Sequence, residues 1–293
     1  MHLALFGRWT KTLNLEVLHD FQAYLAAEGI AYSVHADYLT QLGEHGIELT
    51  GYSRVFETPE ELSGVDFLLS LGGDGTMLDA VRFVGPLGLP IVGVNAGRLG
   101  FLASVSQYEI KAATADLARG AWRLDPRTML TVETRPERKF KQCNYGLNEV
   151  TLHKANSNEM ITIRTFINGE FLNAYWADGL IISTPTGSTA YSLACGGPII
   201  APTSGVLVLT PIAPHSLTVR PVVIADDAVI SFELESRSGQ SLVAVDNLTE
   251  LVDRHTEVAV RKAPFTANLV RLPSRTYFAT LRGRLNWGLD LRN

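Results

Sequence analysis

The sequence predicts an α/β domain followed by an all-β domain, because its hydrophobic pattern changes once along the chain. Up to about Pro126, apolar runs of strand length alternate with segments of helical spacing, which indicates a parallel, doubly wound sheet. After Pro126, short segments alternate apolar and polar residues, which is typical of half-buried strands. The chain has 293 residues, enough for two ordinary hydrophobic cores.

The elements expected in the first domain follow from apolar runs and from the residues that end them. Residues Val65 to Leu71 form a nearly continuous apolar run, as expected of a strand covered on both faces. Gly29 ends the first helix and Gly85-Pro86 ends the next one. The expected strands are Leu3–Phe6, Ile30–Val34, Val65–Leu71 and Ile91–Val94, and the expected helices are Leu13–Leu25 and Met77–Val84.

The second domain is expected to be a set of antiparallel strands. Ile230, Phe232 and Leu234 alternate with polar residues, and the valine pairs 243/245 and 258/260 repeat that alternation. Turns are indicated at Asn168-Gly169 and Ser238-Gly239. Two architectures in one chain imply a cleft between them, and domain interfaces are favoured ligand sites.

Composition excludes several classes of protein. The net charge of -5 gives no general attraction for nucleic acid or anionic lipid. The sequence contains no apolar run long enough for a membrane helix, and the segment Met1–Trp9 has the pattern of a strand and lacks that of a signal peptide. The two cysteines, Cys143 and Cys195, fit neither a disulfide framework nor a zinc motif, so a reducing cytoplasm is the expected location.

The loop Gly72-Gly73-Asp74-Gly75-Thr76 lies between a buried strand and a helix, where open α/β sheets bind ligands. Glycines allow a phosphate to approach the backbone, and the N–H groups of the helix start stabilise it. A carboxylate repels phosphate, so Asp74 needs another purpose: to take a proton from an attacking hydroxyl or to help hold a metal ion. A tight turn with an aspartate helix cap is the equally weighted structural alternative.

The sequence excludes two familiar phosphate-binding loops. It has no G-x-x-x-x-G-K-[ST] motif, which excludes a Walker-type NTPase. It also lacks G-x-G-x-x-G after a strand, which argues against a Rossmann dehydrogenase.

A second polar stretch runs from Asp178 to Ser192. An apolar strand is followed by a turn dense in hydroxyls and by a helix of small residues that ends near Gly196-Gly197-Pro198. Hydroxyls and free N–H groups of this kind suit recognition of a ribose, base or phosphate. Taken alone, a helix capped by Ser or Thr is the simpler interpretation.

Together these segments resemble the NAD kinase family over most of the chain. The loop 72–76, the segment Asn95 to Leu102, the pair Asn148-Glu149, the block 178–191 and the segment Thr210 to Leu217 occur in the family's order and spacing, and the tail at Trp287-Gly288 fits as well. The first loop is shared with lipid kinases and is similar to a loop of phosphofructokinases. The block 178–191 is much more specific.

The resemblance implies a fold and an activity. The implied fold is an N-terminal α/β domain of residues 1–126 and 265–293, with the tail returning to it, and a C-terminal β-sandwich of residues 127–264 that binds NAD. The implied reaction transfers the γ-phosphoryl group of ATP, or polyphosphate, to the adenosine-ribose 2′-hydroxyl of NAD, giving NADP. It also implies Mg²⁺ on the donor phosphates, no metal ligand from the chain, and a homodimer or homotetramer in which a neighbouring subunit helps complete the site.

The resemblance also assigns roles to individual residues. Asp74 is the general base, Asn148 contacts adenine, and Glu149 accepts from the nicotinamide-ribose hydroxyls. Asp178 receives the nicotinamide amide. A buried amide beside a buried carboxylate is costly without such a role. The remaining expected NAD contacts are Gly75, Phe101, Thr189, Ala190, Tyr191, Ser192, Ala213 and Asn247, and the donor phosphates are expected at Gly72, Gly73, Gly75 and Thr76. Phe101 and Ala213 could equally be core residues, and His215 is interpreted as structural.

The sequence departs from the family pattern at two places. Asp246-Asn247 stands where many members have Asp-Gly, and both pairs suit a hairpin turn. Trp176 stands where some bacterial members carry a basic residue, so the choice between NAD and NADH is open.

Two alternatives remain from sequence alone. A lipid or sugar kinase with the same loop is one, although the block 178–191 argues against it. A non-catalytic nucleotide sensor is the other, although such a protein is expected to lack Asp74.

Overall fold

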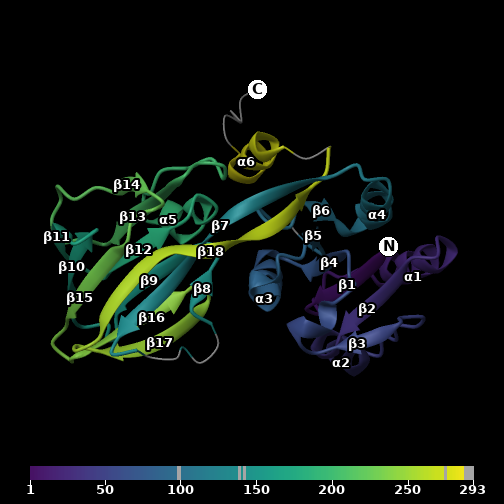
Figure 1. Ribbon diagram of the computed structural model, residues 1–293, viewed down its shortest axis with the longest axis horizontal. Coiled ribbons are helices and arrows are strands. Elements are labelled where there is room, and N and C mark those ends of the chain that lie inside the picture. Colours follow the sequence, from purple (N-terminus) through teal and green to yellow (C-terminus); the bar gives the residue numbers. More distant parts are fainter. Residues whose placement is uncertain (98–99, 138–139, 141–142, 274–275, 287–293) are drawn as a thin grey trace. The chain divides into compact units, whose positions relative to one another are not determined.

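A computed structural model describes residues 1–97, 100–137, 140, 143–273 and 276–286 (Figure 1). The chain divides into two compact units, unit 1 from Met1–Pro126 with Ala267–Asn293, and unit 2 from Arg127–Thr266. Two expected motif segments, Arg98-Leu99 and Trp287-Gly288, lie outside the described residues.

Unit 1 is built on a parallel sheet in the order β3-β2-β1-β4-β5, with β6 and the end of β18 pairing with β5. Each strand ends where a glycine or a polar residue follows an apolar run. The strands are β1 (His2–Gly7), β2 (Ala31–His35), β3 (Arg54–Phe56), β4 (Phe67–Gly72), β5 (Ile91–Asn95) and β6 (Val105–Ser106).

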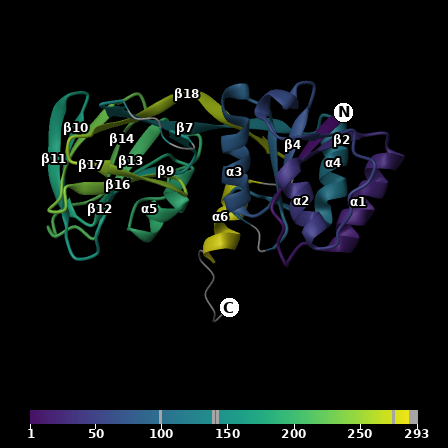
Figure 2. The same ribbon diagram turned by 90° about the horizontal axis from the view of Figure 1, so that it is seen from below.

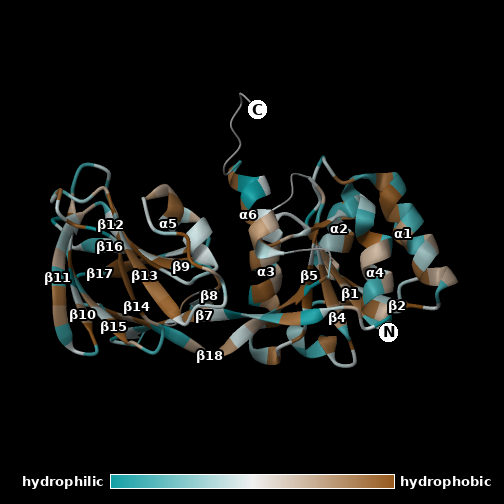
Figure 3. Ribbon diagram, turned by 90° about the horizontal axis from the view of Figure 1, so that it is seen from above, coloured by the Kyte–Doolittle hydropathy of each residue, from teal (hydrophilic) through white to brown (hydrophobic). Residues whose placement is uncertain are grey.

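Helices cover both faces of this sheet. The helices are α1 (Leu15–Ala27), α2 (Ala36–Glu44), α3 (Asp74–Val84), α4 (Ile110–Ala118) and α6 (Tyr277–Leu285). Apolar side chains of α1 and α4 share one core with alternate residues of β1, β4 and β5, while α3 packs on β4 and β5 outside that core. Figure 3 shows these apolar strands lying between the helices of unit 1. Because the loop 72–76 joins β4 to α3, it lies at the carboxyl end of the sheet, as the sequence predicts.

Unit 2 is all-β apart from one short helix, α5 (Tyr191–Ala194), and a 3₁₀ turn at Gly187–Thr189 (Figure 2). Six strands form one antiparallel sheet in the order β14-β13-β12-β9-β16-β17. They are β9 (Glu149–Lys154), β12 (Gly179–Ser183), β13 (Val206–Ile212), β14 (Val222–Ala225), β16 (Gln240–Val245) and β17 (Leu248–Asp253).

The remaining strands of unit 2 form the second layer. They are β7 (Arg123–Arg135), β8 (Tyr145–Gly146), β10 (Ile161–Ile167), β11 (Glu170–Ala177), β15 (Ile230–Glu235) and β18 (Glu257–Arg271), and the order of four of them is β11-β10-β15-β18. Buried side chains of both layers, among them Leu180, Ile182, Ile230 and Phe232, form one core. The boundaries between the units fall inside β7 and β18, so each of these strands contributes residues to both units.

The predicted architecture of an α/β domain and an all-β domain is confirmed. The strands and helices expected in the first domain are present, with ends that differ by at most three residues from those expected. The structure adds, among other elements, helices α2 and α4, each of nine residues. No helix within the described ranges has both the length and the hydropathy to cross a membrane.

Candidate functional site

The side chain of Asp74 is held by three consecutive backbone N–H groups. Its Oδ2 accepts from Phe101 N at 2.8 Å, and its Oδ1 accepts from Leu102 N at 3.1 Å and from Ala103 N at 3.0 Å. The helix cap is Gly73, which has no capping side chain, and Asp74 is the first residue of α3. The alternative of an aspartate helix cap is therefore wrong: the carboxylate binds the segment after β5 instead of its own helix.

Gly100 makes this arrangement sterically possible. A Cβ atom at Gly100 would lie 1.7 Å from Asp74 Oδ1, closer than any real contact. The close approach lets the segment 101–103 run directly over the carboxylate. Any side chain at residue 100 would push Asp74 out of its present position.

The loop presents backbone on one side and a side chain on the other. Added Cβ atoms at Gly73 and Gly75 would meet nothing within 4 Å, so both backbones are open to approach. Thr76 is buried, and its Oγ1 lies 2.2 Å from the position that a Cβ atom of Gly72 would take. The hydroxyl of Thr76 thus packs under the loop, and the N–H groups of the first turn of α3 are the donors available to a phosphate.

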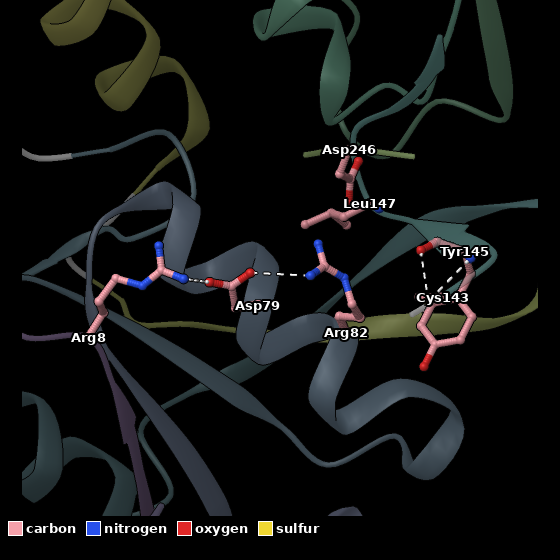
Figure 4. Close-up of polar contacts among 7 residues, drawn as sticks. All are labelled: Arg8, Asp79, Arg82, Cys143, Tyr145, Leu147 and Asp246. Atoms are coloured by element: carbon pink, nitrogen blue, oxygen red, sulfur yellow. Dashed lines mark hydrogen bonds and ion pairs between the residues drawn. The ribbon is translucent and has the colours of Figure 1, made fainter. Parts of the chain in front are cut away.

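A cationic pair flanks Asp79 in the second turn of α3. Arg8 Nη2 lies 2.8 Å from Asp79 Oδ2, and Arg82 Nη1 lies 3.3 Å from Oδ1 (Figure 4). Arg8 follows β1, and its backbone N–H donates to Leu71 O at the end of β4. The Arg8 side chain is 61% exposed, so most of its N–H donors face solvent at the carboxyl end of the sheet.

Unit 2 repeats the arrangement around Asp74. Asp246 Oδ2 accepts from Leu147 N at 2.9 Å, and these two residues are drawn in Figure 4. Asp246 Oδ1 accepts from Asn148 N at 2.8 Å and from Glu149 N at 3.1 Å. Asp246 occupies the turn between β16 and β17 at a φ of 51°. This carboxylate therefore fixes the backbone of the pair that the sequence assigns to NAD.

Glu149 is a buried carboxyl group beside this second aspartate. It is 9% exposed, and Asp246 N donates to its carbonyl oxygen at 2.9 Å. Among the described residues, no group forms a hydrogen bond with its Oε2 atom. Burial and, to a smaller extent, the charge of Asp246 raise the pKa of Glu149 to about 8.

Most hydroxyls of the block 178–192 are buried and bond to the chain itself. Thr184 Oγ1 donates to Leu147 O at 2.7 Å and accepts from Gly187 N at 3.1 Å, while Thr184 N donates to Asn148 O at 2.9 Å. A Cβ at Gly187 would lie 2.1 Å from Asn148 O. This turn is thus a support for Asn148. The buried hydroxyl side chains are Ser183, Thr184, Thr186, Ser188 and Ser192.

Four expected contacts in this block differ in how they are placed. Ser192 is fully buried and bonded to Thr210 Oγ1 at 2.8 Å, so its hydroxyl supports α5. Thr189 and Ala190 are partly exposed, and Tyr191 is exposed at the start of α5. Only the last three leave side-chain surface for a ligand.

Asp178 has a partner that sequence reasoning missed. Lys154 Nζ at the end of β9 lies 2.6 Å from Asp178 Oδ1 and 3.0 Å from Ser157 O. The two opposite charges lie together because β9 and β12 are neighbouring antiparallel strands. Their register places Lys154 next to Asp178, the residue that precedes β12. The ion pair leaves Asp178 Oδ2 as the oxygen available to an amide donor.

The remaining expected residues lie at strand ends. Ala213 follows β13 at a φ of 43°, a conformation rare for a non-glycine residue, and it is exposed. Asn247 is exposed in the turn after Asp246, and Phe101 is partly buried. Trp176 is exposed and lies 4.2 Å, centre to centre, from the ring of His215, so that histidine lines the same surface.

Sequence reasoning missed Gly100, Asp246 and Lys154 as parts of the site. Gly100 allows backbone N–H groups to approach Asp74, and Asp246 accepts hydrogen bonds from such groups. Because almost every residue has a backbone N–H group, residue types do not reveal these contacts. The carboxyl groups present do not form a metal cage: among the described side chains, no three of the His, Cys, Asp and Glu type gather closely enough to hold an ion.

Comparison with known proteins agrees with these features. Residues 28–121 match the family model for the ATP-NAD kinase N-terminal domain, and residues 147–272 match that for the C-terminal domain. The NAD kinase of Cytophaga hutchinsonii is 41% identical over 293 residues, and that of Flavobacterium johnsoniae is 39% identical over 295, each covering 100% of both chains. A yeast NADH kinase in complex with NADH superposes with a TM-score of 0.83 at 25% identity, covering 100% of this chain and 89% of the other.

A further solved structure shares the fold. An NAD kinase from Archaeoglobus fulgidus, solved in complex with ATP, superposes with a TM-score of 0.72 at 24% identity over 98% of this chain and 99% of that one.

An α/β unit with an open glycine loop after a buried strand, joined to a β unit that matches a nucleotide kinase domain, defines a phosphotransferase. The two NAD kinases that are about 40% identical over the full length then identify the family within this class. The chain belongs to the NAD kinase family.

Proposed function

We propose that this chain transfers the γ-phosphoryl group of ATP, or a phosphoryl group of polyphosphate, to the adenosine-ribose 2′-hydroxyl of NAD, with Asp74 as general base. The observation that carries it is the set of three N–H donors on the Asp74 carboxylate.

Those donors leave one oxygen ready to accept a proton. A carboxylate offers about four lone-pair sites, and here Oδ1 accepts twice and Oδ2 once. The free lone pair is on Oδ2. In the reaction, the 2′-oxygen forms a bond to the γ-phosphorus, the bond from phosphorus to the bridging oxygen of ADP breaks, and the hydroxyl proton passes to Oδ2. Because phosphoryl transfer has a loose transition state, a weak base suffices when the proton leaves late.

The proposed NAD contacts are partly or fully exposed residues together with the buried Glu149. Asn148 contacts adenine, Glu149 the nicotinamide-ribose hydroxyls, and Asp178 Oδ2 the nicotinamide amide. Thr189, Ala190, Tyr191, Phe101, Ala213 and Asn247 line the ligand. Ser192 remains a prediction of the sequence alone, because its hydroxyl is committed to Thr210.

The donor phosphates are assigned to Gly72, Gly73, Gly75 and Thr76 at the start of α3, of which Gly73 and Gly75 have backbone open to approach. Arg8 adds positive charge at the same end of the sheet. Mg²⁺ is assigned to the phosphates of the donor, because phosphoryl transfer uses the ion to neutralise charge that develops there.

The assembly belongs to the proposal too. The edge strand β11 exposes the side chains of Phe171, Leu172 and Trp176, and Leu217 is 87% exposed. Apolar surface of this kind supports a homodimer or homotetramer, which light scattering after gel filtration would measure. The two free cysteines agree with a cytoplasmic location.

The test is an enzyme assay with NAD, ATP and Mg²⁺, in which NADP is detected by an NADP-specific dehydrogenase. Polyphosphate replaces ATP in a parallel reaction. Formation of NADP supports the proposal, and its absence with both donors refutes it.

Asp74→Asn tests the general base. We expect kcat to fall by about 10²–10⁴ because the amide cannot accept the proton, while NAD binding measured by calorimetry persists. Asp79→Asn is the matched control on the same helix, and it is expected to retain most turnover. A kcat within a few-fold of wild type for Asp74→Asn would refute the role.

A further inference from the structure

Two carboxyl groups, those of Asp246 and Glu149, interact electrostatically near the start of β9, and Asp246 accepts from three N–H donors. Asp246 accepts from Leu147, Asn148 and Glu149, which favours its ionised form. Glu149 is nine-tenths buried, and no described group bonds to its Oε2. A second buried charge beside the first is unfavourable.

The backbone geometry keeps the two groups together. Val150 of β9 pairs with Val245 of β16, and Asp246 N donates to Glu149 O at the next position. Gly146 allows the approach, because a Cβ there would lie 3.0 Å from Asp246 Cγ. Glu149 therefore cannot move away from Asp246 without breaking the end of the sheet.

We propose that Asp246 is a positioning residue for NAD: it fixes the peptide groups of Asn148 and Glu149, and its charge adds to the effect of burial in keeping Glu149 neutral, so that Glu149 donates an O–H hydrogen bond to the substrate. This inference rests on the proposed function, since it specifies how a residue assigned to NAD binds it. It changes the expected role of Glu149 from acceptor to donor. A ribose hydroxyl or a carbonyl oxygen accepts such a bond.

The neighbours of Glu149 support the neutral form. Among the described groups, the charge that raises the pKa of Glu149 is that of Asp246, after β16. Tyr191 and Cys195, at the two ends of α5, also interact with Glu149, and burial raises the pKa of each, so both are uncharged at neutral pH. Ser183, the partner of Glu149 on β12, is neutral and donates to Thr184 O. Burial and Asp246 together raise the pKa of Glu149 to about 8, so the carboxyl is mostly protonated at neutral pH.

The direct test is a ¹³C NMR titration of the full-length protein labelled at the glutamate carboxyl carbon. The Glu149 signal is assigned by its loss in Glu149→Gln. We expect a midpoint near 8 in the wild type and a midpoint lower by about one unit or more in Asp246→Asn. A wild-type midpoint in the ordinary carboxyl range, near 4–5, would overturn the inference.

The pH dependence of the KM for NAD is the second test. Glutamine, like a neutral carboxylic acid, donates a hydrogen bond and does not titrate, so the KM of Glu149→Gln for NAD is expected to be independent of pH between about 6 and 9, whatever its value at pH 7. In the wild type the KM rises as pH passes the Glu149 midpoint, and in Asp246→Asn that rise begins at lower pH. A Glu149→Gln variant whose KM rises with pH as the wild-type KM does would contradict the neutral donor.

A merely structural Asp246 predicts something else. Asp246→Asn would then raise the KM by the same factor at every pH and leave the Glu149 midpoint unchanged, and that result refutes the electrostatic part of the inference. The titration needs no turnover, so a wild-type chain that forms no NADP would refute the proposed function while the titration still decides the state of Glu149. Should Asp246→Asn fail to fold, the wild-type midpoint and Glu149→Gln decide alone.

Discussion

Asp74 in unit 1 and Asp246 in unit 2 make the same pattern of hydrogen bonds, although they belong to different types of sheet. Each carboxylate accepts three consecutive N–H groups, from residues 101–103 and from residues 147–149. In both cases a glycine, Gly100 or Gly146, comes directly before the three donors and lies against the carboxylate. One aspartate begins a helix of a parallel sheet, and the other occupies a turn of an antiparallel sheet.

The two sites differ in the side chains of the residues whose N–H groups donate. The segment fixed by Asp74 is Phe101-Leu102-Ala103, whose side chains are apolar, so Asp74 itself is the group left to do chemistry. The segment fixed by Asp246 carries Asn148 and Glu149, which are the groups assigned to substrate. The same arrangement therefore positions the aspartate in unit 1 and positions its neighbours in unit 2.

The largest expected effect comes from filling the two glycine positions. Gly100→Ala places a Cβ 1.7 Å from Asp74 Oδ1, so the carboxylate must move, and we expect kcat to fall by about 10²-fold or more. Gly146→Ala places it 3.0 Å from Asp246, a displacement of a few tenths of an ångström, and we expect a rise of a few-fold in the KM for NAD with little change in kcat.

Steady-state kinetics on both variants checks this contrast, and Gly43→Ala is the control because its Cβ would meet nothing within 4 Å. Melting curves establish that each variant is folded. If Gly100→Ala lowered only the affinity for NAD, or if Gly146→Ala abolished kcat, the division of roles between the two aspartates would be wrong.

A smaller effect is expected on stability. The raised pKa of Glu149 means that the unfolded chain releases its proton at lower pH than the folded chain does. Stability is therefore highest below about pH 4.5 with respect to this group and falls as pH rises towards 8. Glu149→Gln removes the loss, so its free energy of unfolding relative to wild type increases between pH 5 and pH 9 by roughly 1–4 kcal/mol.

Urea unfolding at the two pH values measures this difference, with the exposed Glu257→Gln on β18 as control. The control is expected to show no comparable change. A Glu149→Gln variant whose relative stability is the same at both pH values would show that Glu149 is ionised in the folded protein throughout.

The smallest expected effect contrasts these carboxylates with a basic group among aromatic rings. His35 lies 4.7 Å from Phe6, 5.1 Å from Phe83 and 5.3 Å from Phe56, measured between ring centres, and burial lowers its pKa. The unfolded chain takes up the proton first, so stability from the neutral ring is present above about pH 6.5 and is lost as pH falls.

His35→Phe is expected to reduce this acid-side loss, seen as a smaller drop in Tm of a few degrees between pH 7.5 and pH 5.5. His19→Phe, at an exposed position of α1, is the control and should follow the wild-type profile. An unchanged profile in His35→Phe would mean that the imidazole does not titrate in this range.

Patterns that depend on side-chain polarity predicted much of the structure. The run Val65 to Leu71 gave β4 because buried parallel strands are apolar on both faces, and the alternation at Ile230 to Leu234 gave β15. The resemblance supplied Asn148, Glu149 and Asp178. What escaped prediction depends on contacts between distant backbones: Gly100 against Asp74, Asp246 under Asn148, and Lys154 beside Asp178.

The hydroxyl side chains of the block 178–192 show that polarity alone does not predict exposure. Its hydroxyls suggested ligand recognition, since serine and threonine are polar, yet Thr184 and Ser188 are fully buried. A buried hydroxyl needs hydrogen-bond partners, and here it finds them in nearby carbonyl oxygens such as Leu147 O and Pro185 O. Sequence shows that a group is polar but leaves open whether it faces inward or outward.

The boundaries inside β7 and β18 have a consequence for synthesis on the ribosome. Unit 2 is one continuous segment, whereas the core of unit 1 includes Val270 and Leu272, and Leu269 pairs with Ile91. These residues emerge only after all of unit 2 has been translated. The first-made part of unit 1 thus waits for its last strand while unit 2 folds, so the domain that begins first is the one that finishes second.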